Sequence, residues 1–299
     1  MTLSLETYRR AVRIDEIFHT GDSGTPSTQQ IDRTISELLH ILISEGGRGL
    51  GFSAPKDRRL LLRALLTVRP PLPLPDRFWS GLDRVQKWEA ARKEVVDGAA
   101  IPRIASDIPG SRYPAADRCA LWQGDITTLK TDAIVNAANA GLLGCFAPFH
   151  ACIDNAIHWA AGPRLRRDCR VIMEMQGHPE KTGQAKITRG YHLPARYVLH
   201  TVGPVYEGPA SLPGQTGRLA ACYRACLDLG ARVEHIKTIA FCSISTGVFG
   251  FPPNLAARIA LDTVARWMAE HSHPMTVIFN VFSDSDLALY RETVSARRR

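Results

Sequence analysis

Three side chains of metal-binding types lie within eight positions of one another in the segment from Gly144 to Cys152. Cys145, His150 and Cys152 follow the spacing Cys-x4-His-x-Cys. Thiolate and imidazole ligands together suit zinc, and three protein ligands leave one coordination position open for water or substrate. The spacing therefore predicts an open zinc site. The alternatives are a closed site completed by Cys169 or another distant residue, and three unligated side chains in a packed loop.

Asp154 comes two positions after Cys152, at the expected start of a helix. A carboxylate there can act as a general base close to a metal-activated water, or it can cap the helix. Both interpretations stay open on the sequence alone. His158, further along the same helix, is expected to be a packed histidine rather than a ligand.

Two further segments could bind a nucleotide. Asp125, in Gly124-Asp125-Ile126-Thr127, can accept hydrogen bonds from an exocyclic amine, although Asp after Gly commonly makes a turn with its own backbone. The segment 243–252 holds small residues whose consecutive N–H groups could cradle a diphosphate, and a plain strand-to-helix turn is the alternative. It is neither a Walker loop nor a GxGxxG fingerprint, which argues against ATP hydrolysis.

Three more side chains could contact a ribose. Asn136 and Asn139 could hydrogen-bond sugar hydroxyls, and Phe249 could stack on a ribose or base. Asn is also a routine turn former at strand ends, and aromatic residues at the top of a sheet often cover the core. These residues do not decide the ligand alone.

The composition indicates a globular protein with an anionic partner. The chain of 299 residues has 45% hydrophobic residues and a net charge of +8. A nucleic-acid partner is not expected, because the densest basic cluster is the terminal Arg297-Arg298-Arg299, which is typical of a solvated tail rather than of a binding site. No apolar run reaches the roughly 20 residues that cross a membrane, and no signal peptide is visible, so we expect a cytoplasmic protein without a membrane partner. Seven cysteines, an odd number, argue for reduced thiols with a metal-binding subset.

The first part of the chain carries helical patterns. A capping box at Ser27 and Gln30 precedes apolar residues at helical spacing up to Leu42, and two more helices are expected at 60–66 and 78–88. We expect these helices to pack against the rest of the chain, with partner binding as the alternative.

From about Cys119 onward, β-rich runs alternate with helical stretches, which predicts a largely parallel sheet covered on both faces. In such a sheet the ligand binds at the carboxyl ends of the strands. The strands are expected at 119–122, 133–135, 185–188, 197–202, 238–243 and 276–282, and the helices at 154–173, 217–232, 254–270 and 284–294.

Five motifs in this order resemble the macrodomain family: Gly124–Thr127, Ile134–Asn139, Asp154–His158 with Ala161-Gly162, His200–Pro204 and Ser245–Gly250. The resemblance implies an α/β fold, a three-layer α/β/α sandwich with a mixed six-strand sheet, over residues 111–299. Ordinary macrodomain hydrolases carry a run of glycines where this chain has Cys145 to Cys152. That departure resembles the zinc-containing macrodomains, which also have a helical N-terminal extension, here residues 1–110.

Carried over to this chain, the resemblance implies an ADP-ribose site. Asp125 would hold the adenine amine beside the Ile126 backbone. The diphosphate would lie on Ser245, Thr246, Gly247, Val248, Phe249 and Gly250, with Phe249 against the distal ribose. The distal part of the site would contain Asn136, Asn139, Asp154 and Asn155. Two of these residues, Asn139 and Asp154, would be catalytic. One Zn²⁺ would lie beside them, held by Cys145, His150 and Cys152.

The leading hypothesis is a zinc-dependent hydrolase that removes mono-ADP-ribose from modified protein side chains, with acidic residues as the expected class. Zinc would polarise a substrate oxygen or activate the attacking water. The alternative is a non-catalytic ADP-ribose reader in which zinc only braces the loop. The resemblance implies ADP-ribose and a mono-ADP-ribosylated protein as partners, the latter a lipoyl-carrier protein modified by a sirtuin-type transferase.

Overall fold

A mixed sheet of six strands forms the centre of the protein, of which the computed structural model describes residues 2–19, 24, 26–46 and 53–295. The sheet has the order β2-β8-β7-β4-β6-β5. All neighbouring strands are parallel except β5 and β6, which are antiparallel. The strands are β2 (Cys119–Gln123), β4 (Ala133–Ala138), β5 (Ala185–Arg189), β6 (Tyr197–Val202), β7 (Thr238–Phe241) and β8 (Thr276–Val281).

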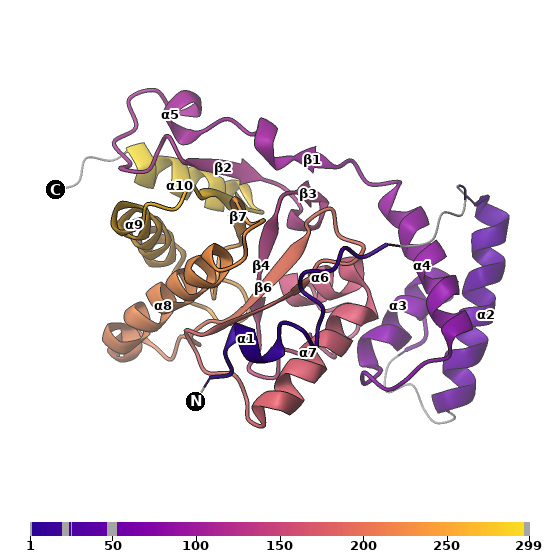
Figure 1. Cartoon of the computed structure of the whole chain (residues 1–299). Coiled ribbons are helices and arrows are strands. Elements are labelled where there is room, and N and C mark those ends of the chain that lie inside the picture. The colour runs from indigo at the N-terminus through magenta and orange to yellow at the C-terminus, as the bar shows by residue number, and fades with distance from the viewer. Residues whose placement is uncertain (1, 20–23, 25, 47–52, 296–299) are drawn as a thin grey trace.

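Helices cover both faces of this sheet, which confirms the expected three-layer α/β/α arrangement (Figure 1). The helices α6 and α7 lie on one side, and α8 and α9 lie on the other (Figure 1). The bounds are α6 (Ile153–Ala161), α7 (Pro163–Gln176), α8 (Leu212–Ala231), α9 (Pro253–Glu270) and α10 (Asp284–Ser295). Shorter elements are α1 (Leu5–Tyr8), α5 (Ile104–Asp107), the strand pair β1 (Val96–Asp97) with β3 (Leu129–Lys130), and the 3-10 turns η1 (Gly98–Ala100), η2 (Ile126–Thr128) and η3 (Pro209–Ser211).

The expected single helix over 154–173 is wrong, because the chain forms α6 and α7 there. Gly162 separates them with a φ of +87°, a value that favours glycine, and Pro163 starts α7. At the other end, α8 begins at Leu212, before the expected start at 217, and Pro213 lies in its first turn. Proline is tolerated there because the first amides of a helix lack intrahelical partners.

Three helices at the N-terminal side form a second, smaller core and are called the helical layer below. They are α2 (Thr28–Gly46), α3 (Arg58–Val68) and α4 (Asp76–Ala90), and their apolar faces pack together. The capping box before α2 is confirmed, since the Ser27 amide donates to Gln30 Oε1 (2.8 Å) and the Gln30 amide donates to Ser27 Oγ (3.3 Å). The layer lies at one end of the molecule beside α6 and α7 (Figure 1).

Part of the region 1–110 packs as part of the sandwich. Leu5, Tyr8, Ile14 and Ile104 are buried in the larger core together with the sheet. The Tyr8 hydroxyl also accepts a hydrogen bond from the amide of Ile187 on β5 (3.0 Å). A separate folding unit ending at residue 110 stays a prediction.

Two features bear on the surroundings of the protein. Among the described residues, no helix combines the length and the apolar character needed to cross a membrane. All seven cysteines carry free thiols. The terminal arginines 297–299 lie outside the described residues.

Candidate active site

The carboxyl ends of five parallel strands meet at one edge of the sheet, and the residues of the sequence motifs follow them there. Asp125 comes after β2, the segment 243–250 follows β7, and Asn139 with the Cys145–Cys152 segment follows β4. Neighbouring strands lie about 4.8 Å apart, so the distance from β2 to β4, three strands further, is roughly 14 Å. These residues therefore form an elongated site along one edge.

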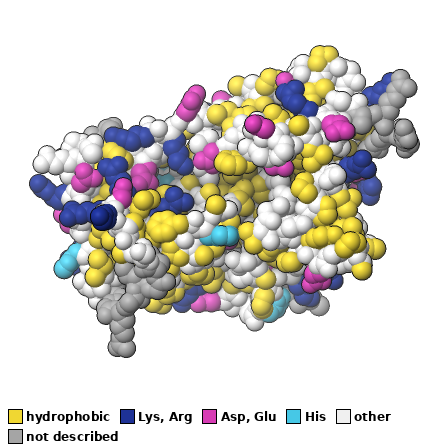
Figure 2. Space-filling model, turned by 180° about the vertical axis from the view of Figure 1, so that it is seen from behind, with side chains coloured by type: hydrophobic (Ala, Val, Ile, Leu, Met, Phe, Trp, Pro, Cys, Tyr) yellow, Lys and Arg dark blue, Asp and Glu magenta, His cyan; other side chains and the backbone are white. Residues whose placement is uncertain are grey.

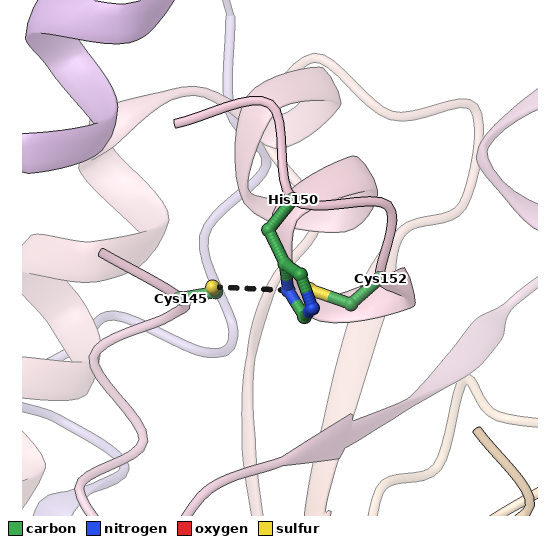
Figure 3. A group of neighbouring side chains, drawn as sticks. All are labelled: Cys145, His150 and Cys152. Carbon is green, nitrogen blue, oxygen red and sulfur yellow. Dashed lines mark hydrogen bonds between the residues drawn. The ribbon is translucent and has the colours of Figure 1, made fainter. Parts of the chain in front are cut away.

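Cys145, His150 and Cys152 lie together, as the spacing predicted (Figure 3). Their ligand atoms are all within 4.8 Å of one another, and Cys145 Sγ is 3.5 Å from His150 Nδ1. A tetrahedral ion with Zn–S of about 2.3 Å and Zn–N of about 2.05 Å separates sulfur and nitrogen by roughly 3.5 Å. The donor set and its spacing thus fit zinc. Cys169 lies elsewhere, in a buried group with His158 and His200.

The Cys152 end of the segment is anchored to α6. Cys152 is the N-cap of α6, and its Sγ accepts a hydrogen bond from the amide of Asn155 (3.5 Å). The Asn155 side chain donates to the carbonyls of Ala147 (2.8 Å) and His150 (3.1 Å). Burial raises the pKa of the Cys152 thiol to about 11, so a metal that binds there displaces a proton.

Asp154 does not cap the helix; its carboxylate lies in a buried polar network. Asn136 Nδ2 donates to Asp154 Oδ1 (2.8 Å) and to His200 Nδ1 (3.2 Å), which uses both hydrogens of that amide. His200 then carries its proton on Nε2, 2.9 Å from Thr188 Oγ1. Burial raises the pKa of Asp154 to about 6, against the opposing hydrogen bond from Asn136. Burial also lowers the pKa of His200 to about 3, so this imidazole is neutral.

Asn136 is fully buried, and its amide is engaged by Asp154 and His200. This placement favours a role in orienting Asp154 over contact with a ligand. His158 is packed inside as expected, with Nε2 3.5 Å from Asp154 Oδ1. The contact between Asn136 and His200 could not be predicted from local patterns, because these residues are 64 positions apart and meet only through the pairing of β4 with β6.

Asp125 makes the turn that the sequence allowed and keeps one oxygen for other partners. Its Oδ1 accepts hydrogen bonds from the amide (2.9 Å) and hydroxyl (2.7 Å) of Thr127. Its Oδ2 lies 3.8 Å from Lys93 Nζ, and the side chain is 47% exposed. Ile126, the next residue, is buried.

Phe282 is a candidate ligand contact that the sequence analysis missed. It follows β8, the strand beside β2, and 78% of its surface is exposed. Its carbonyl accepts a hydrogen bond from Gln123 Nε2 (3.3 Å) at the end of β2. Its position could have been noticed in the sequence, because an aromatic residue directly after a strand lies at the edge where the parallel strands end.

The segment after β7 has the form of an anion cradle. Ser245 has a φ of +66°, and the Phe251 amide donates to its carbonyl (2.9 Å). Within the described part of the chain, Ser245 Oγ is buried without a partner, and the amides of Gly247, Val248 and Phe249 donate to no protein acceptor. Such a run of available N–H groups suits a phosphate.

The remaining predicted residues of this segment lie at its rim. Val248 is 71% exposed, Gly250 has a φ of +65°, and the Thr246 hydroxyl donates to the Ser243 carbonyl (3.0 Å). The Phe249 carbonyl accepts a hydrogen bond from the Tyr206 amide (2.8 Å), which ties the segment to the chain after β6.

Asn139 is exposed and shapes the start of the segment 144–152, called the metal segment below because it contains the three candidate metal ligands. Its Nδ2 donates to the Gly144 carbonyl (3.1 Å), and its Oδ1 accepts from the Gly141 amide (2.9 Å). Gly144 has a φ of +84°, and an added Cβ would lie about 3.0 Å from the ring of His158. A side chain at this position would therefore be strained by the backbone conformation and crowded by the His158 ring.

Comparisons with known proteins agree with this geometry. The Macro domain family model matches residues 135–260. A protein of Treponema medium named "Protein-ADP-ribose hydrolase" is 45% identical over 262 residues, which cover 86% of this chain and 97% of that protein. A Fusarium oxysporum f. sp. cubense protein named "Probable bifunctional ADP-ribose hydrolase/ADP-ribosyltransferase" is 38% identical, covering 93% of this chain and 46% of that protein. A crystal structure of a Trypanosoma brucei macrodomain in complex with ADP-ribose is similar with a TM-score of 0.57 and 36% identity, covering 68% of this chain and 78% of that chain.

Proposed function

This chain belongs to the Macro domain family, and on that premise we propose that it hydrolyses the bond between ADP-ribose and a modified protein side chain. The observation that carries the proposal is the order of groups along the sheet edge: Asp125, then the segment 243–250, then the Cys145 group. ADP-ribose presents an amine, a diphosphate and a distal ribose in that order. The 45% identity to a protein named for this activity supports the same conclusion.

Adenine binds at the β2 end. Asp125 Oδ2 accepts a hydrogen bond from the exocyclic amine, since Oδ1 is already used by Thr127. The exposed ring of Phe282 stacks on the base, which is the common way an aromatic side chain binds a nucleobase. The backbone of Ile126 lies beside the base.

The diphosphate binds on the segment 245–250. Its oxygens accept hydrogen bonds from the amides of Gly247, Val248 and Phe249 and from the buried Ser245 hydroxyl. Preorganised N–H groups cost little reorganisation when an anion binds. Phe249 lies against the distal ribose, and Asn139 hydrogen-bonds it.

Hydrolysis takes place where the distal ribose lies beside Cys145, His150 and Cys152. These three side chains would hold a zinc ion there, which would supply a Lewis acid for an oxygen of the substrate or of the attacking water. The Asp154 carboxylate, fixed by Asn136, accepts the proton of that water as its oxygen bonds to the ribose carbon. The bond to the protein side chain breaks, and its electron pair leaves with the side-chain oxygen. A carboxylate leaves without being protonated, which favours modified Asp or Glu as the substrate.

The partner is a mono-ADP-ribosylated protein, and we include in the proposal a lipoyl-carrier protein modified by a sirtuin-type transferase. The Fusarium relative supports a link with ADP-ribosylation, because its name joins the hydrolase with an ADP-ribosyltransferase. Over the end formed by the helical layer, Lys and Arg side chains are interspersed with Asp and Glu side chains (Figure 2), so a protein partner would meet charges of both signs there. Free thiols agree with a cytoplasmic location.

The test is release of free ADP-ribose from proteins modified on Asp or Glu and, separately, on Ser. Native protein is compared with protein stripped by a zinc chelator and with stripped protein given zinc or magnesium. We expect cleavage of the acidic linkage, loss on stripping, and recovery with zinc alone, while ADP-ribose affinity by calorimetry changes little. Binding without cleavage in every sample would establish the reader instead, and cleavage that survives stripping would remove zinc from the reaction.

A further inference from the structure

One buried arginine joins the helical layer to the metal segment. Arg166, on α7, is 5% exposed. Its Nη1 donates to the carbonyls of Leu66 (2.9 Å), Thr67 (3.0 Å) and Arg69 (2.9 Å), at the C-terminal end of α3. The last carbonyls of a helix lack intrahelical partners and carry partial negative charge, so a guanidinium is well placed there.

The same guanidinium also contacts the metal segment. Arg166 Cζ lies 4.5 Å from the ring centroid of Phe146, within the range of a cation–π contact. Phe146 directly follows Cys145 and is 41% exposed. Arg166 therefore connects α7, the end of α3 and the residue next to a proposed metal ligand.

The two ends of the metal segment are held in different ways. Cys152 is fixed by α6, and Asn155 holds the carbonyls of Ala147 and His150. Cys145 lies on the half without a helix, where the contacts include the hydrogen bond from Asn139 to Gly144, the approach of Cys145 Sγ to His150 Nδ1 and the ring of Phe146 on Arg166. Ligands that the protein holds in position beforehand bind a metal more tightly, because less ordering is left to do when the metal binds.

We propose that Arg166 is a positioning residue: anchored on the carbonyls at the end of α3, it holds the ring of Phe146 and so keeps Cys145 in reach of His150 and Cys152. This inference rests on the proposed zinc site. It gives the helical layer a direct part in metal binding, because the anchor of Arg166 is α3. Loss of the contact lowers zinc affinity and leaves the adenine and diphosphate contacts intact.

The experiment measures zinc affinity by competition with a chromophoric chelator, on native protein and on Phe146→Leu, Phe146→Tyr, Arg166→Lys and Arg167→Lys. Phe146→Leu removes the ring at a partly exposed position, so folding is not at risk, and Phe146→Tyr keeps the ring. Arg167 is the neighbouring, exposed arginine of α7 and serves as the matched control.

Loss of a cation–π contact corresponds to about five- to tenfold weaker zinc binding, which we expect for Phe146→Leu and Arg166→Lys. Phe146→Tyr and Arg167→Lys are expected within about twofold of native. The double variant Arg166→Lys/Phe146→Leu should be no weaker than the weaker single variant, because both remove one interaction. ADP-ribose affinity should not change, and saturating zinc should restore the turnover of Phe146→Leu.

Native zinc affinity in Phe146→Leu would overturn this inference and leave the zinc site standing, even if Arg166→Lys binds zinc weakly. Equal losses in Phe146→Tyr and Phe146→Leu would also overturn it, because the ring would then not be the element that matters. A native protein that binds no zinc at all would instead overturn the proposed zinc site together with this inference.

Discussion

The attachment of the helical layer to the sandwich can be tested at Asp83. This carboxylate on α4 accepts bidentate hydrogen bonds from the Arg164 guanidinium on α7, with Arg164 Nη2 2.9 Å from Asp83 Oδ2. Asp83 Oδ1 also lies 3.0 Å from His192 Nε2. The side chains of Asp83, Arg164 and His192 are 19%, 15% and 5% exposed. The group is therefore largely shielded from water.

Asp83→Asn keeps the shape and removes the charge, which leaves Arg164 without its ionic partner. Breaking a fully buried pair costs about 3–5 kcal/mol, and an exposed pair contributes about 0.2–1 kcal/mol. At the exposure of this group we expect a loss of about 2–3 kcal/mol in the free energy of unfolding.

The matched control is Asp15→Asn. Arg9 also binds Asp15 through two nitrogens, Nε (2.9 Å) and Nη2 (2.6 Å), but the Asp15 side chain is 61% exposed. We expect this change to cost less than about 1 kcal/mol. Urea unfolding of both variants and native protein measures the difference. Equal losses in the two variants would refute the claim that this ion pair attaches the layer.

Three further predictions concern acid stability and the site. Burial raises the pKa of Asp83, but hydrogen bonds from His192 and Arg164 outweigh this effect, so the pKa lies below its usual value of 3.8. The contribution of the Asp83 carboxylate to the free energy of unfolding is therefore complete above pH 3.8 and is lost as the pH falls through the lowered pKa. The stability difference between native protein and Asp83→Asn should therefore shrink in acid, and a constant difference would contradict this. Phe282→Ala should weaken ADP-ribose binding about tenfold by calorimetry, because base stacking is lost, and native affinity would remove Phe282 from the site. Asn136→Ala should lower turnover at least about tenfold with little change in ADP-ribose affinity, because Asp154 loses its orienting hydrogen bond; parallel losses in both would make Asn136 a binding residue.

Local sequence patterns predicted most of the helices and strands and the grouping of Cys145, His150 and Cys152. The metal spacing is local, since Cys145, His150 and Cys152 lie on one short segment, and the capping box of α2 is equally local. The mixed sheet followed from the family resemblance, since periodicity alone could not show that β5 runs against β6. The break between α6 and α7 was missed although Gly162-Pro163 is visible in the sequence, because apolar periodicity continues across it.

Contacts between distant residues could not be read from the sequence. Arg166 and Leu66 are 100 positions apart, and nothing near either residue indicates that α3 ends on α7. The network of Asn136, Asp154 and His200 likewise depends on which strands are neighbours. For Asp125, local chemistry allowed both a turn and a ligand contact, and the structure uses one carboxylate oxygen for the turn and exposes the side chain.

The most direct test of the central claim compares native protein with Cys145→Ala on a protein mono-ADP-ribosylated at acidic residues. Cys226→Ala, which removes a thiol buried in the core, is the control for loss of a cysteine. The account predicts that native protein and Cys226→Ala release ADP-ribose, and that Cys145→Ala still binds ADP-ribose but releases none. Undiminished release by Cys145→Ala would contradict the account.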